Sequence, residues 1–150
     1  MKNYYVFVVL VLLLTGCGSQ NQKVDIVDQV DISNGGIVAG EVESSIIEKT
    51  PHIYEYRLKN QTEQMVEFKF NTSQRFDYTV QTKDAKGIFR LSDSNSYKSE
   101  ITTETIKQGE ELIYEINLTE LDLKSGEYLL SVWMTTDVGE EYKIVIDIII

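Results

Sequence analysis

The 150-residue chain has one cysteine, one histidine and one proline. A single cysteine cannot form a disulfide within the chain, and one cysteine with one histidine leaves too few ligands for a zinc site. Sole His52 precedes a predicted strand, where we expect a surface or edge residue rather than the base of a Ser-His-Asp arrangement. These shortages predict a protein that is not an enzyme and has no metal or cofactor.

Basic residues are also scarce, with 14 Lys and Arg against 24 Asp and Glu and a net charge of −10. Such a surface repels nucleic acid and anionic lipid headgroups. Glycosidase chemistry would need two carboxylates held across a cleft. The paired acids lie beside predicted turns, where we expect them only to aid solubility: Glu110 and Glu111, Glu140 and Glu141, Glu120 and Asp122.

The apolar run Tyr5–Leu14 is too short to span a bilayer, but it has the length of the hydrophobic core of a signal peptide. It ends in Leu-Thr-Gly-Cys at residues 14–17, which is similar to a bacterial lipobox. The alternative is an ordinary signal peptide that ends near a cysteine. We predict a lipoprotein signal peptide at residues 1–16 and lipid attachment at Cys17. Acylation with more than one chain would anchor the protein stably to the outer side of the cell membrane.

Residues 17–35 are predicted to be a lipidated tether, because they lack aromatic residues and carry Ser, Asn, Gln and Gly at both ends. The middle of this stretch, residues 24–32, is more apolar than a simple linker. It is either part of the linker, an early strand or a segment that orders on a partner.

From residue 36 onward the apolar residues alternate with a period of two, as in strands that have one buried face. The clearest rows are Tyr54, Tyr56, Leu58; Val66, Phe68, Phe70; Phe76, Tyr78, Val80; Leu112, Tyr114, Ile116, Leu118; Tyr128, Leu130, Val132, Met134; and Tyr142, Ile144, Ile146, Ile148, Ile150. Asp77 alternates with the third row and is expected on the solvated side. No sustained helical periodicity interrupts these rows. Residues 36–150 are therefore predicted to form an all-β domain, an immunoglobulin-like antiparallel β-sandwich of about 7–9 strands.

Several connections have a predicted form. Residues 37–48 are a first strand region that Pro51 ends, and 83–87 are a hairpin turn with Gly87 at a positive φ. Ser92–Lys98 is a polar loop. Its Asp93 and Asn95 have the spacing that begins a calcium loop, but Lys98 stands where such a loop needs glycine, so the match fails. Residues 101–106 have a strand-like pattern and are rich in Thr, so we predict that they form an edge strand. The last strand should be paired internally, since an open apolar edge promotes aggregation.

The stretch Asn71–Asp77 is the best candidate for a specific contact. Arg75 and Phe76 could bind a partner protein, as Arg and aromatic residues do at hot spots, together with Asp77 and with Tyr97 of the polar loop. The alternative is architectural: Arg75 pairs with Asp77, Phe76 enters the core, and Gln74 and Asp77 bond to the turn backbone.

The chain from about Tyr54 to Met134 resembles the BsuPI family of intracellular proteinase inhibitors. The resemblance is carried by Leu-Lys-Asn-Gln-Thr at 58–62, Ser-Gln-Arg-Phe-Asp at 73–77 ahead of a strand, Gly-Ile-Phe-Arg-Leu-Ser at 87–92, Gly-Glu at 109–110 and Gly-Glu-Tyr at 126–128. It implies an immunoglobulin-like sandwich that binds proteins and restrains proteinases. The chain departs from the family in its lipobox, in Gln108 where a proline is expected and in Phe89 where a tryptophan is expected.

The sequence therefore predicts a membrane-anchored, extracytoplasmic protein-binding module that inhibits a secreted or envelope proteinase. The alternative is a structural or adaptor lipoprotein of the cell envelope without inhibitory action. A hydrolase ranks third, because no pair of nucleophile and base is evident.

Overall fold

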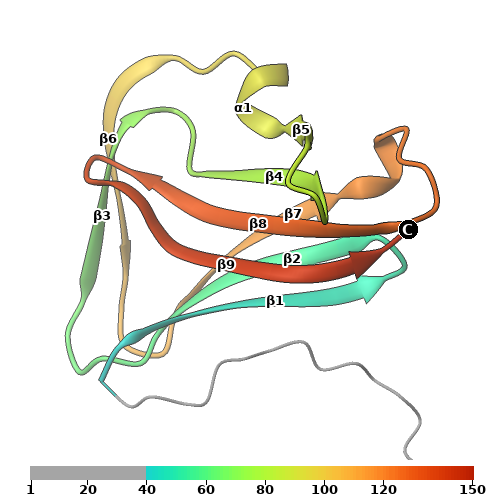
Figure 1. Cartoon of the computed structure of the whole chain (residues 1–150). Coiled ribbons are helices and arrows are strands. Elements are labelled where there is room, and N and C mark those ends of the chain that lie inside the picture. The colour runs from blue at the N-terminus through green and yellow to red at the C-terminus, as the bar shows by residue number, and fades with distance from the viewer. Residues whose placement is uncertain (1–39) are drawn as a thin grey trace, which may run out of the picture.

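The computed structural model describes residues 40–150, which form nine strands and two short helices (Figure 1). The elements are β1 (Val42–Thr50), β2 (Ile53–Asn60), β3 (Val66–Thr72), β4 (Phe76–Thr82), β5 (Gly87–Arg90), α1 (Leu91–Ser94), β6 (Ser99–Ile106), β7 (Glu111–Asn117), the 3-10 helix η1 (Leu118–Glu120), β8 (Glu127–Thr136) and β9 (Gly139–Ile149). None of the helices in this part of the chain combines the length and the apolar character needed to cross a membrane. Cys17, residues 24–32 and the predicted domain boundary at residues 35–36 lie outside the described residues.

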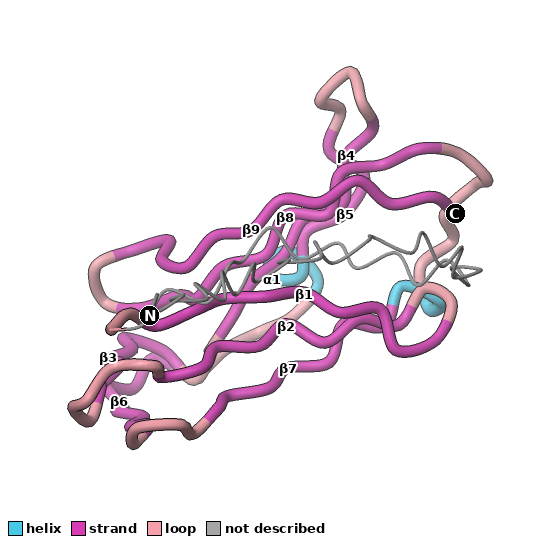
Figure 2. The backbone as a smooth tube through the Cα atoms, turned by 90° about the horizontal axis from the view of Figure 1, so that it is seen from below, coloured by secondary structure: helices cyan, strands magenta, loops and turns pink. Residues whose placement is uncertain are grey.

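The strands form three antiparallel sheets, in the orders β1-β2-β7, β3-β6 and β5-β4-β8-β9. The three-stranded and four-stranded sheets lie as two layers, and the β3–β6 ribbon stands across one end of them (Figures 1 and 2). The prediction of an all-β antiparallel sandwich is confirmed.

The core lies where the alternating rows of the sequence meet between the layers. Strands with one apolar row bury that row and leave the other to solvent or to a covering segment. The buried side chains that make up this core include Tyr54, Tyr56, Leu58, Phe68, Phe70, Tyr78, Val80, Ile116, Leu130, Val132, Met134, Ile146 and Ile148. Phe76 is partly buried and packs against them. The predicted inward rows are therefore confirmed.

Strands β2, β3 and β4 follow one another closely in the sequence, yet each belongs to a different sheet. Asn60 organises the first of these crossings. Its buried side-chain amide donates to the carbonyls of Gln64 (2.7 Å) and Ile106 (2.9 Å), and its Oδ1 accepts from the Thr62 amide (2.9 Å). A single asparagine thus satisfies backbone groups of β6 and of the turn that joins β2 to β3.

Two predicted connections differ in the structure. The positive φ of the β4–β5 turn falls on Ala85 (61°) and not on Gly87, because a hydrogen bond from the Thr82 amide to the Lys86 carbonyl (3.0 Å) closes a shorter loop. The predicted polar loop begins as helix α1. The Asn95 side chain caps this helix by donating to the Leu91 carbonyl (3.0 Å).

The edges of the sheets agree with the prediction in part. Strand β1 ends immediately before Pro51, as expected, and residues 37–39 of the predicted first strand lie outside the described residues. Within residues 40–150, β6 pairs only with β3 and is an edge strand, as predicted. Among the strands of residues 40–150, β9 pairs with β8 alone and forms the edge of the four-stranded sheet, so its predicted internal pairing is confirmed on one side only.

Candidate functional site

Arg75 lies in the turn between β3 and β4 and is held by three groups. Its Nε donates to Glu104 Oε1 of β6 (2.5 Å), and its guanidinium also donates to the Thr72 carbonyl (3.0 Å). The guanidinium carbon lies 4.6 Å from the centre of the Phe70 ring, in cation–π geometry. Arg75 is therefore bound within its own domain and joins the turn to β6.

Phe76 is held in the same cluster. Its ring stacks on Tyr114 of β7, with 4.8 Å between the ring centres. The Tyr114 hydroxyl donates to Glu104 Oε2 (3.1 Å), so the Glu104 carboxylate accepts hydrogen bonds from both Tyr114 and Arg75. Burial raises the pKa of the Tyr114 phenol above its usual value, and the Glu104 charge adds to the effect. The architectural interpretation is thus correct in placing Phe76 against the core.

Asp77 lies on the outer face of the four-stranded sheet but is only 1% exposed. Its Oδ2 accepts from Arg90 Nε of β5 (2.8 Å), and its Oδ1 accepts from the amide of Ser92 in α1 (3.1 Å). The prediction of a solvated Asp77 is therefore wrong, because β5 and α1 fold back over it. The predicted pair between Arg75 and Asp77 is also wrong, since each binds another partner.

Tyr97 lies near Asp77. Burial raises the pKa of the Tyr97 phenol, and the Asp77 carboxylate contributes to the shift. The hydrogen bond and charge of Asp77 likewise raise the pKa of the Arg90 guanidinium. The structure thus divides the four predicted partner-binding residues into two groups, Arg75 with Phe76 and Asp77 with Tyr97. Whether any of them contacts a partner stays a prediction.

Trp133 was not predicted as a site residue, yet it lies directly beside Asp77 in the register of β8 and β4. Trp133 is only 3% exposed although it is on the outer face of the sheet. Two cations cover its ring: the Arg90 guanidinium at 5.3 Å and the Lys143 ammonium at 4.8 Å from the ring centre. The sequence offers one sign that this position is special. A large aromatic residue stands there among the β8 residues that alternate with the buried ones.

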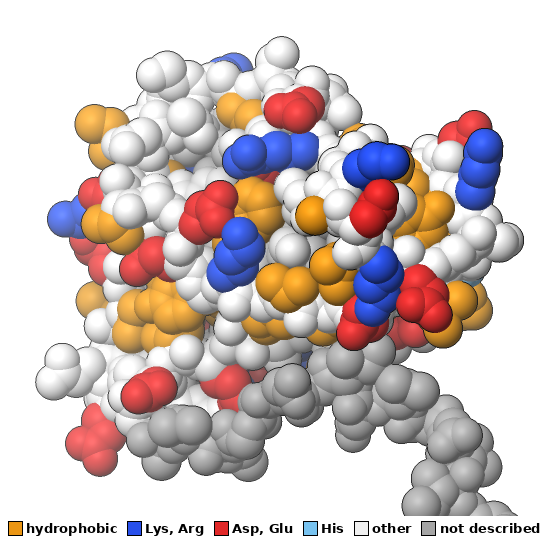
Figure 3. Space-filling view, in the orientation of Figure 1, with side chains coloured by type: hydrophobic (Ala, Val, Ile, Leu, Met, Phe, Trp, Pro, Cys, Tyr) orange, Lys and Arg blue, Asp and Glu red, His pale blue; other side chains and the backbone are white. Residues whose placement is uncertain are grey.

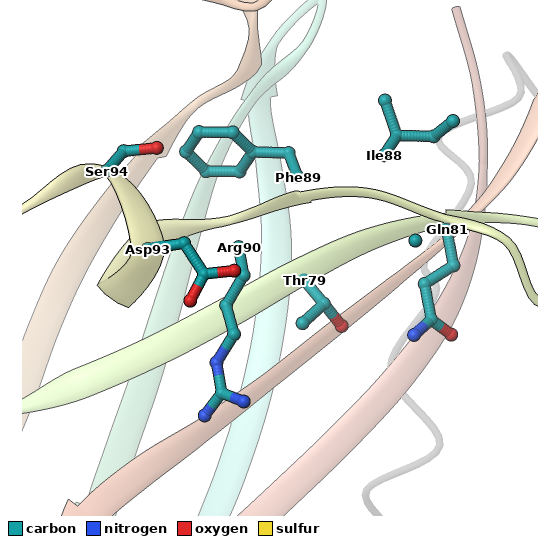
Figure 4. Close-up of a pocket in the computed structure, with 8 residues that line it drawn as sticks. Thr79, Gln81, Ile88, Phe89, Arg90, Asp93 and Ser94 are labelled. Atoms are coloured by element: carbon teal, nitrogen blue, oxygen red, sulfur yellow. The ribbon is translucent and has the colours of Figure 1, made fainter.

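A groove of about 410 Å³ adjoins this cluster on the outer side of the sheet (Figure 4). Its walls come from β4, β5 and α1, and the lining residues are Thr79, Gln81, Gly87, Ile88, Phe89, Arg90, Asp93 and Ser94. Figure 4 shows Ile88 and Phe89 on one side of β5 and Arg90 on the other. The groove offers apolar, polar and charged contacts, but its lining contains neither cysteine nor histidine.

On the side of the domain that Figure 3 shows, the charges do not form one patch. Acidic, basic and hydrophobic side chains are interspersed over the side that Figure 3 shows. Within residues 40–150, no three His, Cys, Asp or Glu side chains come close enough together to hold a metal ion. His52 lies in the turn between β1 and β2 and is partly buried, in line with an edge position.

Comparison with known protein families gave a match that covers most of the described domain. A family model described as BsuPI, intracellular proteinase inhibitor, matches residues 41–138. The match begins just before β1 and ends in the turn between β8 and β9. No curated protein matches the chain. At position 89, where a tryptophan was expected, Phe89 packs against Tyr78 with 5.5 Å between the ring centres, so an aromatic contact is kept there.

Proposed function

Since the chain belongs to the BsuPI family, described as intracellular proteinase inhibitors, we propose that it is a protein-binding module that inhibits a proteinase. The observation that carries the proposal is the family match, which spans β1 to β8 and therefore almost the whole described fold. Binding rather than catalysis is the action proposed. In this proposal residues 36–150 are the inhibitory domain.

The family is described as intracellular, whereas the location proposed for this chain is the outer face of the cell membrane. The lipobox at residues 14–17 supports a signal peptide over residues 1–16 and lipidation of Cys17. Residues 17–35 would then tether the domain to the outer face of the cell membrane. A proteinase that such a domain can meet is secreted or belongs to the envelope.

The contact is proposed at the end of the sandwich that carries the turn between β3 and β4. Rigidity there supports a role in inhibition, because a partner binds a preformed surface without a further cost in ordering. The interactions of Arg75 with Glu104 and of Phe76 with Tyr114 supply that rigidity.

A second candidate is an adaptor or structural lipoprotein of the envelope with no inhibitory action. The lipobox favours it, because a domain outside the cytoplasm cannot meet an intracellular proteinase. In that case, the groove beside Arg90 would be the proposed binding site for a partner protein.

A titration separates the two candidates. The full chain is added in increasing amounts to subtilisin-type and other secreted proteinases while the hydrolysis of a small substrate is followed. Saturable inhibition with the chain left uncleaved is the expected result. Absence of inhibition, or digestion of the chain as a substrate, would overturn the inhibitor proposal and favour the adaptor.

A further inference from the structure

Strand β6 presents an isoleucine to solvent at an open strand edge. Ile101 is 84% exposed, and within residues 40–150 β6 is paired with β3 alone. The register shifts here: Phe70 pairs with Thr102 and Thr72 with Ser99, so two residues of β6 lie opposite one residue of β3. Such a bulge turns a side chain away from the regular face of the ribbon. Ile101 is one of the two bulged residues.

The bulge is fixed on both sides. Before it, the Ser73 amide donates to the Lys98 carbonyl (2.9 Å), and the Lys98 amide donates to Ser73 Oγ (3.0 Å). After it, the Glu104 carboxylate accepts hydrogen bonds from Arg75 of the turn and from Tyr114 of β7. The segment that displays Ile101 is therefore extended and already ordered, which lowers the entropic cost of binding.

A second exposed aliphatic side chain lies at the same end of the domain. Val138, in the turn between β8 and β9, is 75% exposed. The neighbouring Asp137 amide donates to the Lys69 carbonyl of β3 (2.7 Å), which places this turn against the ribbon. Figures 1 and 2 both show the turn and the ribbon at one end, and Figure 3 shows hydrophobic side chains along that margin. We call Glu100, Ile101, Thr103 and Val138 the β6 end surface.

An isolated exposed hydrophobic residue needs no explanation, and bulges also protect edge strands from aggregation. Protection alone does not account for this bulge. A charged residue such as Glu100 discourages another strand from pairing with an edge, whereas an exposed isoleucine beside it favours such pairing. An open edge with an outward aliphatic side chain instead suits the addition of a partner strand, in which backbone hydrogen bonds give affinity and side-chain pockets give specificity.

We propose that the β6 end surface is the proteinase contact, with Ile101 filling the specificity pocket and the open edge of β6 pairing with the proteinase's substrate groove. The proposal rests on the inhibitory function proposed above and names its partner more narrowly. The partner is a proteinase whose specificity pocket is apolar and accepts a β-branched aliphatic side chain. Arg75 and Tyr114 act through Glu104 as positioning residues rather than as contacts.

The first test compares two alanine variants of the full chain. Ile101→Ala removes the proposed anchor, and Ile149→Ala is the matched control, since Ile149 is 72% exposed at the far end of β9 (Figure 1). Burying an isoleucine side chain corresponds to a factor of roughly ten to one hundred in affinity, so Ile101→Ala should raise Ki by that factor. Ile149→Ala should change Ki less than about twofold. Thermal unfolding of both variants shows whether they are folded.

The second test is a gain of specificity. A trypsin-type pocket holds an aspartate that binds Lys or Arg. Ile101→Lys should therefore create inhibition of trypsin and weaken inhibition of proteinases with an apolar pocket. Because residue 101 is at the surface, the lysine should leave the fold intact.

The outcomes separate the two proposals. If the unmodified chain inhibits a proteinase and both substitutions at residue 101 leave Ki and specificity unchanged, the contact assigned to β6 is wrong and the inhibitory function stands. If the unmodified chain inhibits none of the proteinases tested, the inhibitory function fails and this contact fails with it.

Discussion

Asp77 and Arg90 form an ion pair, with 2.8 Å between Oδ2 and Nε, that joins the outer face of β4 to β5. The carboxylate is almost completely buried, and the guanidinium is partly exposed. A buried carboxylate is tolerated only when charge and hydrogen bonds compensate the loss of water. Here Arg90 supplies the charge, and the amides of Ser92 and Tyr78 supply further hydrogen bonds.

Replacing Asp77 should therefore destabilise the domain. Asp77→Ala leaves the Ser92 amide and the Arg90 guanidinium without their partner and loosens the cover formed by β5 and α1. We expect the free energy of unfolding to fall by about 3 kcal/mol, as for the loss of one member of a buried pair. Urea unfolding followed by far-UV circular dichroism measures the change. Asp93→Ala, at an exposed position of α1, is the control and should cost less than about 0.5 kcal/mol.

Trp133 is the only tryptophan and offers a direct probe of its two cations. Lys143→Gln removes the ammonium that lies 4.8 Å from the ring centre. We expect a loss of stability of about 0.5–1 kcal/mol and a red shift of the native fluorescence, since water gains access to the ring. Lys86→Gln removes an exposed lysine that pairs with Asp84 across a turn, and it should alter neither property. Identical spectra for Lys143→Gln and the unmodified chain would argue against the cation–π contact.

Alkaline pH should unfold the domain through its buried tyrosines. Burial raises the pKa of Tyr78 from 10.0 to about 12, and burial with the Glu48 charge raises that of Tyr54 to about 12. The folded state therefore holds these phenolic protons more tightly than the unfolded chain does. Stability should be complete below pH 10 and decline between about pH 10 and 12, by roughly 2–3 kcal/mol for each tyrosine.

Unfolding of Tyr78→Phe across the same pH range checks this expectation. Phenylalanine cannot ionise, so the variant should lose less stability between pH 9 and 12 than the unmodified chain. Parallel pH profiles for the two proteins would mean that Tyr78 is not responsible.

The inward rows of the strands were predictable from the sequence, because a period of two is a local property of the chain. Tyr54, Tyr56 and Leu58 are buried as predicted. The sheet partners were not predictable, since short connections such as the one held by Asn60 lead to another sheet as easily as to a hairpin. The burial of Asp77 depends on Arg90 and on the backbone of α1, which no pattern within β4 reveals.

Whether the stretch 71–77 binds a partner stays a prediction, and the contacts of its residues within the domain were predictable only in part. The stretch 71–77 lies at an end of the domain where β3, β4 and β6 meet. The partner of Arg75, however, is Glu104 and not the nearby Asp77, because β6 is brought beside β3 only by long-range pairing. Exposure of Ile101 arises from a bulge, and the register that creates the bulge is a property of two strands together.

The proposed anchor has its own test. Cys17→Ser removes the thiol that lipid attachment requires, so the protein should leave the membrane fraction and appear in the soluble extracytoplasmic fraction. Incorporation of labelled fatty acid should be lost in the same variant. Because the substitution is outside the described domain, proteinase inhibition by the purified variant should not change. A variant that stays in the membrane fraction and still takes up label would refute lipidation at Cys17.

Substitutions of Arg75 and Glu104 test whether the turn residues bind a partner directly or position β6. Arg75→Ala removes the bond to Glu104 and should weaken inhibition, but a direct contact with the proteinase would have the same effect. A double-mutant cycle distinguishes the two, because residues that act through one another are not additive. If Arg75 acts through Glu104, then Glu104→Gln should weaken inhibition similarly and the double variant should be little worse than either single one.

Additive losses in inhibition would instead place Arg75 in contact with the proteinase, as in the partner-binding interpretation of the sequence. Stability measured on the same variants supplies the independent readout. A positioning role costs about 1 kcal/mol of unfolding free energy in each single variant, since the pair is partly buried, and the two costs should again fail to add. The hydrogen bonds of Arg75 are present in the free domain, so this loss of stability is expected whether or not Arg75 also contacts the proteinase. The additivity of the losses in inhibition thus decides whether the turn or the β6 edge meets the proteinase.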